Sequence, residues 1–314
     1  MSEHQAHVFR GVKVVRNIIT RRGLGVLLVA IVWRSSGAQP SERVSYISNS
    51  SVDIILVAHQ DDWQLFMGDV IAKRIQSGMP VVFIYLTAGD DGRDSLYWAT
   101  RERGALESTR VAAGLAAADP TGDQCSTANV LEHAIRRCTI ANTTSYFLRL
   151  ADGRRNGSGF AAHSYQSLRK LRSKRTASIS AVDGSAAYGS WADLTNTVSE
   201  LIGESLTDRI ATIHTTDPSV MLNPHDHFDH RMAGLLIADS RGKHSWNVAY
   251  YTGYALASRA ANRSNGQMRE KTALFMAYDR VMTQVNPKWS AYREHPTFYS
   301  ECMQRTYARR VVSH

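Results

Sequence analysis

The chain has 314 residues, a length that suits one large α/β domain or two small ones. Of these residues 43% are hydrophobic and 21% charged, an ordinary composition for a globular protein. Its formal net charge of +9 suggests an anionic partner, but residues 1–38 hold six basic residues and one acid. Subtracting these from the totals of 37 and 28 leaves 31 basic against 27 acidic residues. The excess is thus largely N-terminal. Since no module that reads RNA or DNA is visible, we expect no nucleic-acid partner.

The N-terminus has the organisation of an export signal. A basic region ending at Arg22 precedes an apolar run at 24–33 and small residues at 36–38, which resemble a cleavage site. We predict a signal peptide at residues 1–38 and a linker at 39–50. The protein is then exported to the periplasm or the cell exterior by the Sec route or, given the adjacent arginines, the twin-arginine route. An uncleaved anchor is the less favoured alternative and would be the only membrane contact.

From residue 51 onward, apolar runs alternate with helical patterns in a single predicted domain, 51–314. Four short apolar runs predict strands at 52–58, 81–86, 210–214 and 248–254. Apolar residues at helical spacing predict helices at 63–77, 101–115, 191–206, 230–238 and 271–285. This alternation favours an α/β fold with a doubly wound, mostly parallel, Rossmann-like sheet. Residues 119–190 are polar and are expected to form long, irregular loops around the site.

Three cysteines are consistent with an oxidising compartment. Cys125 and Cys138 flank a polar segment and could close a modest loop, which would leave Cys302 unpaired. No Cys-x-x-Cys pair is present, so a thiolate zinc finger is not expected.

Two acids and a histidine follow the first predicted strand directly, in the sequence His59-Gln60-Asp61-Asp62-Trp63. The carboxyl ends of strands are where open α/β sheets place their ligands. His59 and Asp62 are three residues apart, so one turn can direct both side chains at a single point, while Asp61 stays free for proton transfer. By itself this pattern also fits a capping cluster for the next helix, because aspartate is a good N-cap residue.

A second polar motif, Asn223-Pro224-His225-Asp226-His227-Phe228-Asp229-His230-Arg231, favours a metal site over a capping cluster. Three histidines and two aspartates within eight residues are hard to explain by packing alone, although a solvated polar loop is the alternative. One imidazole from this segment would complete a set of two nitrogens and one carboxylate. Such a set leaves the fourth tetrahedral position of zinc open to water, as catalytic sites require.

Together these motifs resemble those of the PIG-L/LmbE-like family of zinc-dependent de-N-acetylases, and most closely its exported bacterial members. The similarity covers most of residues 51–310. Besides His59 to Asp62, it includes Leu86 to Gly92, Tyr97 to Gly104 and Asp226 to His230. Members of the family deacetylate N-acetylglucosamine-type groups in glycolipids, thiol-sugar precursors and glycopeptide antibiotics.

The resemblance implies a role for each matching residue. His59, Asp62 and His230 would bind zinc, with Fe²⁺ as the alternative metal for such donors. Asp61 would be the general base, and His227 would stabilise the oxyanion or protonate the leaving amine. The resemblance implies roles for three more residues. Asp229 would orient a histidine, and Asp90 and Arg101 would contact sugar hydroxyls.

Two departures from the family pattern affect the surroundings of the site. The common box reads His-Pro-Asp-Asp-Glu, whereas this chain has Gln60 in place of the proline and Trp63 in place of the glutamate. The Arg-x-x-Glu of many members ends here in Gly104. Neither change removes a ligand, but both are expected to reshape the pocket.

The chemistry of these residues agrees with an amide hydrolase. A bound metal lowers the pKa of water and polarises the carbonyl, and a neighbouring carboxylate takes the proton. No Gly-x-Ser-x-Gly motif is present, which disfavours a serine nucleophile. We therefore expect a zinc-dependent hydrolase that removes an N-acetyl or N-acyl group from an amino sugar or glycoconjugate. The alternatives are an amidase for a non-sugar amide and a catalytically silent carbohydrate-binding protein.

Overall fold

The computed structural model describes residues 51–115, 124–206, 210–240 and 246–311. The predicted signal peptide and linker at residues 1–50 lie outside this part of the chain. The described residues belong to one compact unit, which is built around a sheet of eight strands. Among the helices of the described part, none is long and apolar enough to cross a membrane.

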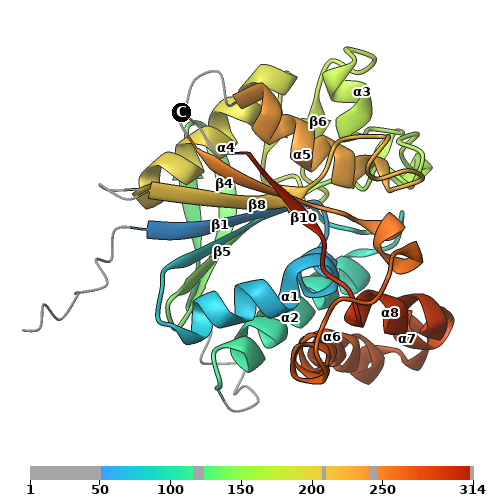
Figure 1. The fold of residues 1–314 in the computed structure, drawn as a ribbon. Helices are drawn as coiled ribbons and strands as arrows, with labels where there is room; N and C mark the ends of the chain where they lie inside the picture. Colours follow the sequence, from blue (N-terminus) through green and yellow to red (C-terminus); the bar gives the residue numbers. More distant parts are fainter. Residues whose placement is uncertain (1–50, 116–123, 207–209, 241–245, 312–314) are drawn as a thin grey trace, which may run out of the picture. The chain divides into compact units, whose positions relative to one another are not determined.

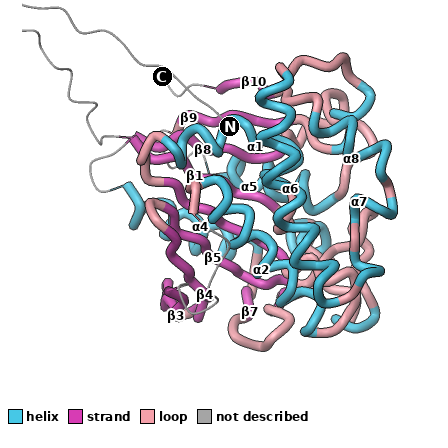
Figure 2. Tube along the Cα trace, turned by 90° about the horizontal axis from the view of Figure 1, so that it is seen from below, coloured by secondary structure: helices cyan, strands magenta, loops and turns pink. Residues whose placement is uncertain are grey.

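The sheet is mixed but mostly parallel. Figure 2 shows its strands in magenta, with the helices in cyan. Its strands in spatial order are β10 (Ala308–Val311), β9 (Asn247–Tyr251), β8 (Ile210–Thr216), β1 (Ser51–Val57), β2 (Val81–Thr87), β5 (Thr143–Leu150), β4 (His133–Ile140) and β3 (Gln124–Val130). The five strands from β9 to β5 are parallel to one another, whereas β10, β4 and β3 pair antiparallel. The expected α/β fold with a mostly parallel sheet is therefore confirmed.

Helices cover both faces of the sheet (Figure 1). One face packs against α3 (Leu168–Arg172), α4 (Trp191–Leu206) and α5 (Phe228–Ser240). The other packs against α1 (Asp62–Gln76), α2 (Ser95–Ala112), α6 (Asn265–Val285) and α8 (Pro296–Met303). Successive side chains of a strand point to opposite faces, so Ile54 and Leu56 of β1 join the first core and Ile55 and Val57 the second. Because both faces are buried, β1 has the continuous apolar run that marked it in the sequence.

The remaining elements are short. They are η2 (Ala161–His163), β6 (Ile179–Ser180), β7 (Ala187–Tyr188), η4 (Tyr254–Ser258), η5 (Pro287–Trp289) and α7 (Ala291–Glu294). Strands β6 and β7 form a separate two-stranded sheet.

The expectation of irregular loops throughout residues 119–190 was wrong for residues 124–150. This segment forms β3, β4 and β5, which extend the main sheet at one edge. Its two tight turns place Leu131 and Ala141 in the left-handed region, at φ of 47° and 49°. Hairpins are usually recognised by Asn-Gly or Asp-Gly at such positions, and neither pair occurs here, so the sequence carried no turn signal.

The other predicted strands and helices are present, with some shifted ends. The helix expected at 101–115 begins earlier, at Ser95, because the Asp94 side chain accepts a hydrogen bond from the backbone N–H of Tyr97 and caps it. Likewise, α6 begins at Asn265 behind a capping box formed by Ser264 and Gln267.

Cys125 and Cys138 form a disulfide between directly opposed positions of β3 and β4. Cys302 is buried and carries a free thiol. The pairing that the sequence left open is thus present in the structure.

The order of the strands determines where a site can form. From β1 the chain continues to β2 on one side, whereas β8 pairs with β1 on the other. The order of connection therefore reverses between β1 and β8, and ligands of open α/β sheets bind beyond the carboxyl ends of strands at such a point. The segment after β1 holds His59, and the segment after β8 holds His227 and His230.

Candidate metal centre and active site

The segment after β1 forms a tight turn that leads into α1. The backbone N–H of His59 donates to Oδ2 of Asp62 at 2.8 Å, which closes the turn and brings both side chains to the same side. Asp61 occupies the N-cap position of α1, yet its side chain makes no capping hydrogen bond. The side chain of Asp61 therefore does not cap α1, which was the alternative role that the sequence allowed.

The segment after β8 presents His230 from the first turn of α5. Its Nδ1 lies 2.9 Å from Oδ1 of Asp226, and its backbone oxygen accepts a hydrogen bond from the Thr216 hydroxyl at 2.6 Å. These contacts fix both the ring and the start of the helix. The imidazole is fully buried, and its Nε2 faces the segment after β1.

The three residues predicted to bind zinc meet at one point. Nε2 of His230 lies 3.0 Å from Oδ1 of Asp62 and 3.1 Å from Nδ1 of His59. The remaining pair, Nδ1 of His59 and Oδ1 of Asp62, is 3.5 Å apart. Two donors bound to one tetrahedral zinc at about 2.0–2.1 Å would be about 3.4 Å apart, so the spacing fits a shared ion.

The hydrogen-bond partners of the two imidazoles also favour a cation. Asp226 accepts the proton on Nδ1 of His230, which directs the lone pair of Nε2 toward Asp62. The Nε2 atom of His59 faces carboxylates of Asp152 and Asp229, at 3.6 and 3.8 Å, a setting that favours the proton on Nε2 and the lone pair on Nδ1. Two nitrogen lone pairs and a carboxylate oxygen therefore converge, an arrangement that repels unless positive charge lies among them.

The pKa values shift in the direction that this convergence requires. Burial opposes a charge on His230, but Asp62 and Asp226 outweigh it and raise its pKa to about 10. Burial likewise opposes a charge on His59, whose pKa is nevertheless raised well above its ordinary value, chiefly by Asp62. The same contacts lower the pKa of Asp62 despite its burial, because His230 and His59 stabilise its carboxylate. The pocket thus favours bound positive charge.

Asp229 lies near two histidines. Its Oδ2 accepts a hydrogen bond from Gly153 N at 2.7 Å and lies 3.8 Å from Nε2 of His59 and 3.9 Å from Nδ1 of His227. Its Oδ1 is buried and has no hydrogen-bond partner among the described residues, and the same is true of Nε2 of His59. The carboxylate that contacts Nδ1 of His230, the ring nitrogen that does not face Asp62, is Asp226, for which the sequence had suggested no individual role.

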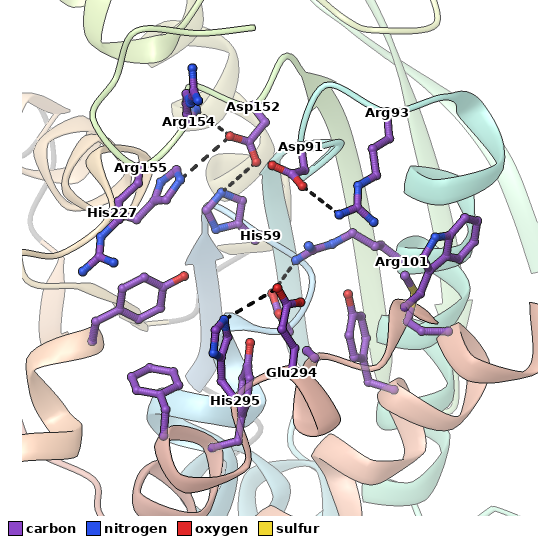
Figure 3. A pocket seen from close by; sticks show the side chains of 18 of the residues that line it. His59, Asp91, Arg93, Arg101, Asp152, Arg154, Arg155, His227, Glu294 and His295 are labelled. Carbon is purple, nitrogen blue, oxygen red and sulfur yellow. Dashed lines mark hydrogen bonds and ion pairs between the residues drawn. The ribbon is translucent and has the colours of Figure 1, made fainter. Parts of the chain in front are cut away.

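Asp152 is a second residue that the sequence did not single out. It follows β5, and its carboxylate lies 3.6 Å from Nε2 of His59 and 3.8 Å from Nε2 of His227 (Figure 3). Burial raises its pKa to about 6 against the opposing effect of His59. The signal for Asp152 was its place after a strand, but that strand lay in the segment expected to be irregular.

His227 has one ring nitrogen occupied and one directed at the cavity. The backbone N–H of Asp229 donates to Nδ1 at 3.1 Å. In the neutral ring the proton therefore sits on Nε2, the nitrogen on the side of Asp152. Burial and the charge of His59 hold the pKa of His227 well below its ordinary value.

Asp61 is held from one side only. Its Oδ1 accepts a hydrogen bond from Nη2 of Arg101 at 2.6 Å, and no other hydrogen bond of its side chain is present among the described residues. Arg101 also donates from Nε to Oε1 of Gln60 at 3.2 Å. Arg101 lines the cavity, as Figure 3 shows, and its guanidinium contacts both Asp61 and Gln60.

A cavity of about 800 Å³ opens in front of these residues. His59, Asp61, Asp152 and His227 line it on the side of the sheet, and an opposite wall comes from residues 254–299. That wall is largely aromatic and includes Tyr254, Tyr278, Trp289, Phe298 and Tyr299. Glu294 and His295 add polar groups to the same wall (Figure 3).

Asp90 and Trp63 do not reach this cavity. Asp90 is fully buried, and its carboxylate accepts hydrogen bonds from the backbone of Gly92 and of Asp152, each at 2.9 Å. Its Oδ2 also lies 2.9 Å from Nε2 of His163. It therefore has no surface that a sugar hydroxyl could touch, and instead ties together the segments after β2 and β5. Trp63 is fully buried and packs against Phe83.

The sequence model of the PIG-L family, described as GlcNAc-PI de-N-acetylase, matches residues 54–240. The matched segment is more than half of the chain and contains the whole cluster from His59 to His230. The aromatic wall at 254–299 lies beyond it. No curated protein matches the chain in sequence.

Solved structures of similar fold include an N,N′-diacetylchitobiose deacetylase from Pyrococcus horikoshii, at 16% identity and a TM-score of 0.44, with 84% of each chain covered. A deacetylase of the teicoplanin biosynthetic pathway is 12% identical, with a TM-score of 0.42 and 80% of this chain and 88% of the other covered. The 4-carboxy-2-hydroxymuconate hydratase GalB from Pseudomonas putida is 14% identical, with a TM-score of 0.35 and coverages of 78% and 88%. Likeness at this level carries no functional information.

Proposed function

Because the chain belongs to the PIG-L family, described as GlcNAc-PI de-N-acetylase, we propose that it is a metal-dependent hydrolase that removes an N-acetyl or N-acyl group from an amino sugar or glycoconjugate. The observation that carries the proposal is the convergence of His59, Asp62 and His230 beside Asp61, at one end of a cavity large enough for such a substrate.

The donor set fits a zinc ion. Two imidazole nitrogens and one carboxylate oxygen would hold it, from His59, His230 and Asp62. Iron(II) is the alternative, because it also binds two histidines and a carboxylate. When bound, the metal supplies Lewis acidity, which makes water acidic enough to be deprotonated near neutral pH and polarises the amide carbonyl.

The side chains of the chain itself supply the proton transfers. Asp61, held at Oδ1 by Arg101, accepts the proton of the attacking water on its free Oδ2. His227, with its proton on Nε2, donates a hydrogen bond to the oxyanion of the tetrahedral intermediate. The leaving amine then takes a proton from Asp61 or His227.

A panel of substrates tests this function. We expect the purified, zinc-loaded protein to release free amine from N-acyl amino sugars, and Asp61→Asn to keep its zinc but lose about 10²–10⁴-fold in turnover. Near-normal turnover of Asp61→Asn would remove Asp61 from the mechanism.

The same panel separates the alternatives. Amine release from N-acyl peptides but not from amino sugars would identify an amidase for non-sugar amides. Glycan binding without amine release at saturating zinc would identify a carbohydrate-binding protein.

We propose further that the protein is exported. The sequence pattern at residues 1–38 and the Cys125–Cys138 disulfide support an oxidising compartment outside the cytoplasm. N-terminal sequencing of the protein from its own host should find a mature chain that begins near residue 39. Recovery of the uncleaved chain from the cytoplasm would contradict export.

A further inference from the structure

Two residues at which this chain departs from the resembled family pattern lie next to Arg101 or next to one of its partners. Gln60 occupies the position that is commonly proline, and Gly104 the position that is often glutamate. Gln60 accepts a hydrogen bond from Nε of Arg101 at 3.2 Å, and Nη2 of the same guanidinium donates to Asp61 at 2.6 Å. One planar group therefore connects Gln60 to the acid beside the metal cluster.

The amide of Gln60 is itself fixed in orientation. Its Nε2 donates to the backbone oxygen of Thr87 at 2.8 Å, so Oε1 must face Arg101. The side chain is fully buried. Gly89, at φ of 56°, packs against the contact, and a Cβ there would lie 2.7 Å from Oε1 of Gln60 and 2.9 Å from Nε of Arg101. The space around this hydrogen bond is thus filled. A proline at position 60 would supply neither the side-chain oxygen that accepts from Arg101 nor the side-chain N–H that donates to Thr87.

Gly104 affects the same guanidinium through Tyr278. A Cβ at this position would lie 2.6 Å from Cδ2 of Tyr278, so glycine lets the α6 residue approach α2. The ring of Tyr278 lies 5.8 Å from Cζ of Arg101, within the range of a cation–π contact. Arg101 thus contacts both the amide of Gln60 and the ring of Tyr278.

Asp61 needs such support because its own contacts are few. Beyond the bond to Arg101, its carboxylate makes no hydrogen bond within the described part of the chain. Without Arg101 it could rotate about its side-chain bonds, whereas with Arg101 its Oδ1 is fixed and Oδ2 remains for proton transfer. A general base must lie within hydrogen-bond reach of the proton it accepts, so its orientation bears directly on rate.

We propose that Gln60 is a positioning residue, which orients Arg101 so that this arginine holds Asp61 in the geometry of the general base. The expected effect on catalysis rests on the proposed function, because it requires Asp61 to be the general base. The orientation of Arg101 and Asp61 by Gln60 does not depend on that function. In this arrangement a contact with the acid replaces the expected contact of Arg101 with a sugar hydroxyl.

Gln64 provides a matched control. It is equally buried and lies four residues further along, where its Nε2 donates to the backbone oxygen of Gln60 and to the Ser108 hydroxyl, at 3.1 and 3.0 Å. We expect Gln60→Ala to lower kcat about 10- to 100-fold, with KM and zinc content as in the unaltered protein. Gln64→Ala should lower thermal stability to a similar extent but leave kcat unchanged. Equal kcat values for the two variants would overturn the proposal.

A double-mutant cycle tests whether Gln60 acts through Arg101. Arg101→Ala should lower kcat, and adding Gln60→Ala to it should cause no further loss, because the path to Asp61 is already broken. Multiplicative losses would show that the two side chains act independently and would contradict the proposal.

A crystal structure of Gln60→Ala separates a failure of this inference from a failure of the proposed function. We expect the Asp61 carboxylate to have turned away from Arg101, whatever reaction the protein catalyses. If Arg101 and Asp61 keep their hydrogen bond in that variant, the positioning role is refuted, even if the unaltered protein hydrolyses amino-sugar amides.

Discussion

Asp226 shows how a single carboxylate can organise a site without entering it. Its Oδ1 lies 2.9 Å from Nδ1 of His230 and accepts the backbone N–H of Tyr254 at 3.0 Å. Its Oδ2 accepts a hydrogen bond from Asn223 at 2.5 Å. These bonds fix the tautomer of His230 and connect the segment after β8 to the segment after β9. Ligand histidines are generally oriented by such carboxylates.

Zinc titration of residue variants checks these assignments. We expect His59→Ala, Asp62→Ala and His230→Ala to lose bound zinc. Asp226→Ala should weaken zinc binding about 10- to 100-fold, because His230 is then free to rotate and to change tautomer.

The exposed Asp239→Ala, on the same helix as His230, is the control and should bind zinc normally. Full zinc content in all three ligand variants would refute the ligand set.

At the scale of elements, α6 connects the C-terminal segment to the rest of the molecule. Its Lys271 is fully buried, and Nζ donates to the backbone oxygens of Cys302 and Arg305 and to the Thr306 hydroxyl. That hydroxyl in turn donates to Asp69 of α1 at 2.9 Å. The aromatic wall of the cavity belongs to this C-terminal segment, so the network holds the wall against α1.

The buried amine gives stability a defined pH dependence. Burial lowers the pKa of Lys271 from 10.5 to about 8, with Asp69 in partial opposition. Between these values the unfolded chain carries a proton that the folded chain lacks, so the free energy of unfolding rises with pH. Relative to Lys271→Met, the unaltered protein should gain about 2 kcal/mol between pH 8 and pH 10. Urea denaturation of both proteins at both pH values measures this, and parallel pH dependences would contradict it.

The disulfide stabilises the edge of the sheet formed by β3 and β4. It joins residues 13 apart in sequence, and closing a loop of that size restricts the unfolded chain. We expect the Cys125→Ala/Cys138→Ala variant to lose about 3 kcal/mol in the free energy of unfolding by urea. Reduction of the unaltered protein should reproduce the loss. Since the metal cluster is built from other segments, zinc binding should persist in both cases.

For the whole molecule, a bound ion would join two segments that follow neighbouring strands of the sheet. His59 and Asp62 come after β1, and His230 comes after β8, about 170 residues later. Metal that binds only the folded state stabilises it by mass action, by about 2.7 kcal/mol at a free concentration 100 times Kd.

Thermal unfolding with and without a chelator measures this coupling. We expect chelation to lower Tm reversibly in the unaltered protein and to have no effect on His230→Ala. An identical response of the two proteins would show that this cluster does not bind the ion.

The local pattern predicted much of the fold. The apolar runs at β1 and β2 and the helical spacing of α4 were clear, because burial of both faces of a strand gives a continuous apolar run and burial of one stripe of a helix gives a periodic one. The turns at Leu131 and Ala141 have no comparable sequence pattern. Asp152, which follows the resulting strand, was therefore missed, although it lies next to His59 in space.

The chemical groups of the site could be recognised from the amino-acid sequence alone: histidine and aspartate at turn spacing after a strand, and a second group of the same kind far along the chain. Spacing along the chain cannot, however, reveal which side chains meet when their segments are joined only through the sheet. The pairing of β1 with β8 brought His59 to His230, and the packing of α2 on α6 brought Tyr278 under Arg101. Such contacts depend on strand order and helix packing, which are properties of the whole chain rather than of any motif.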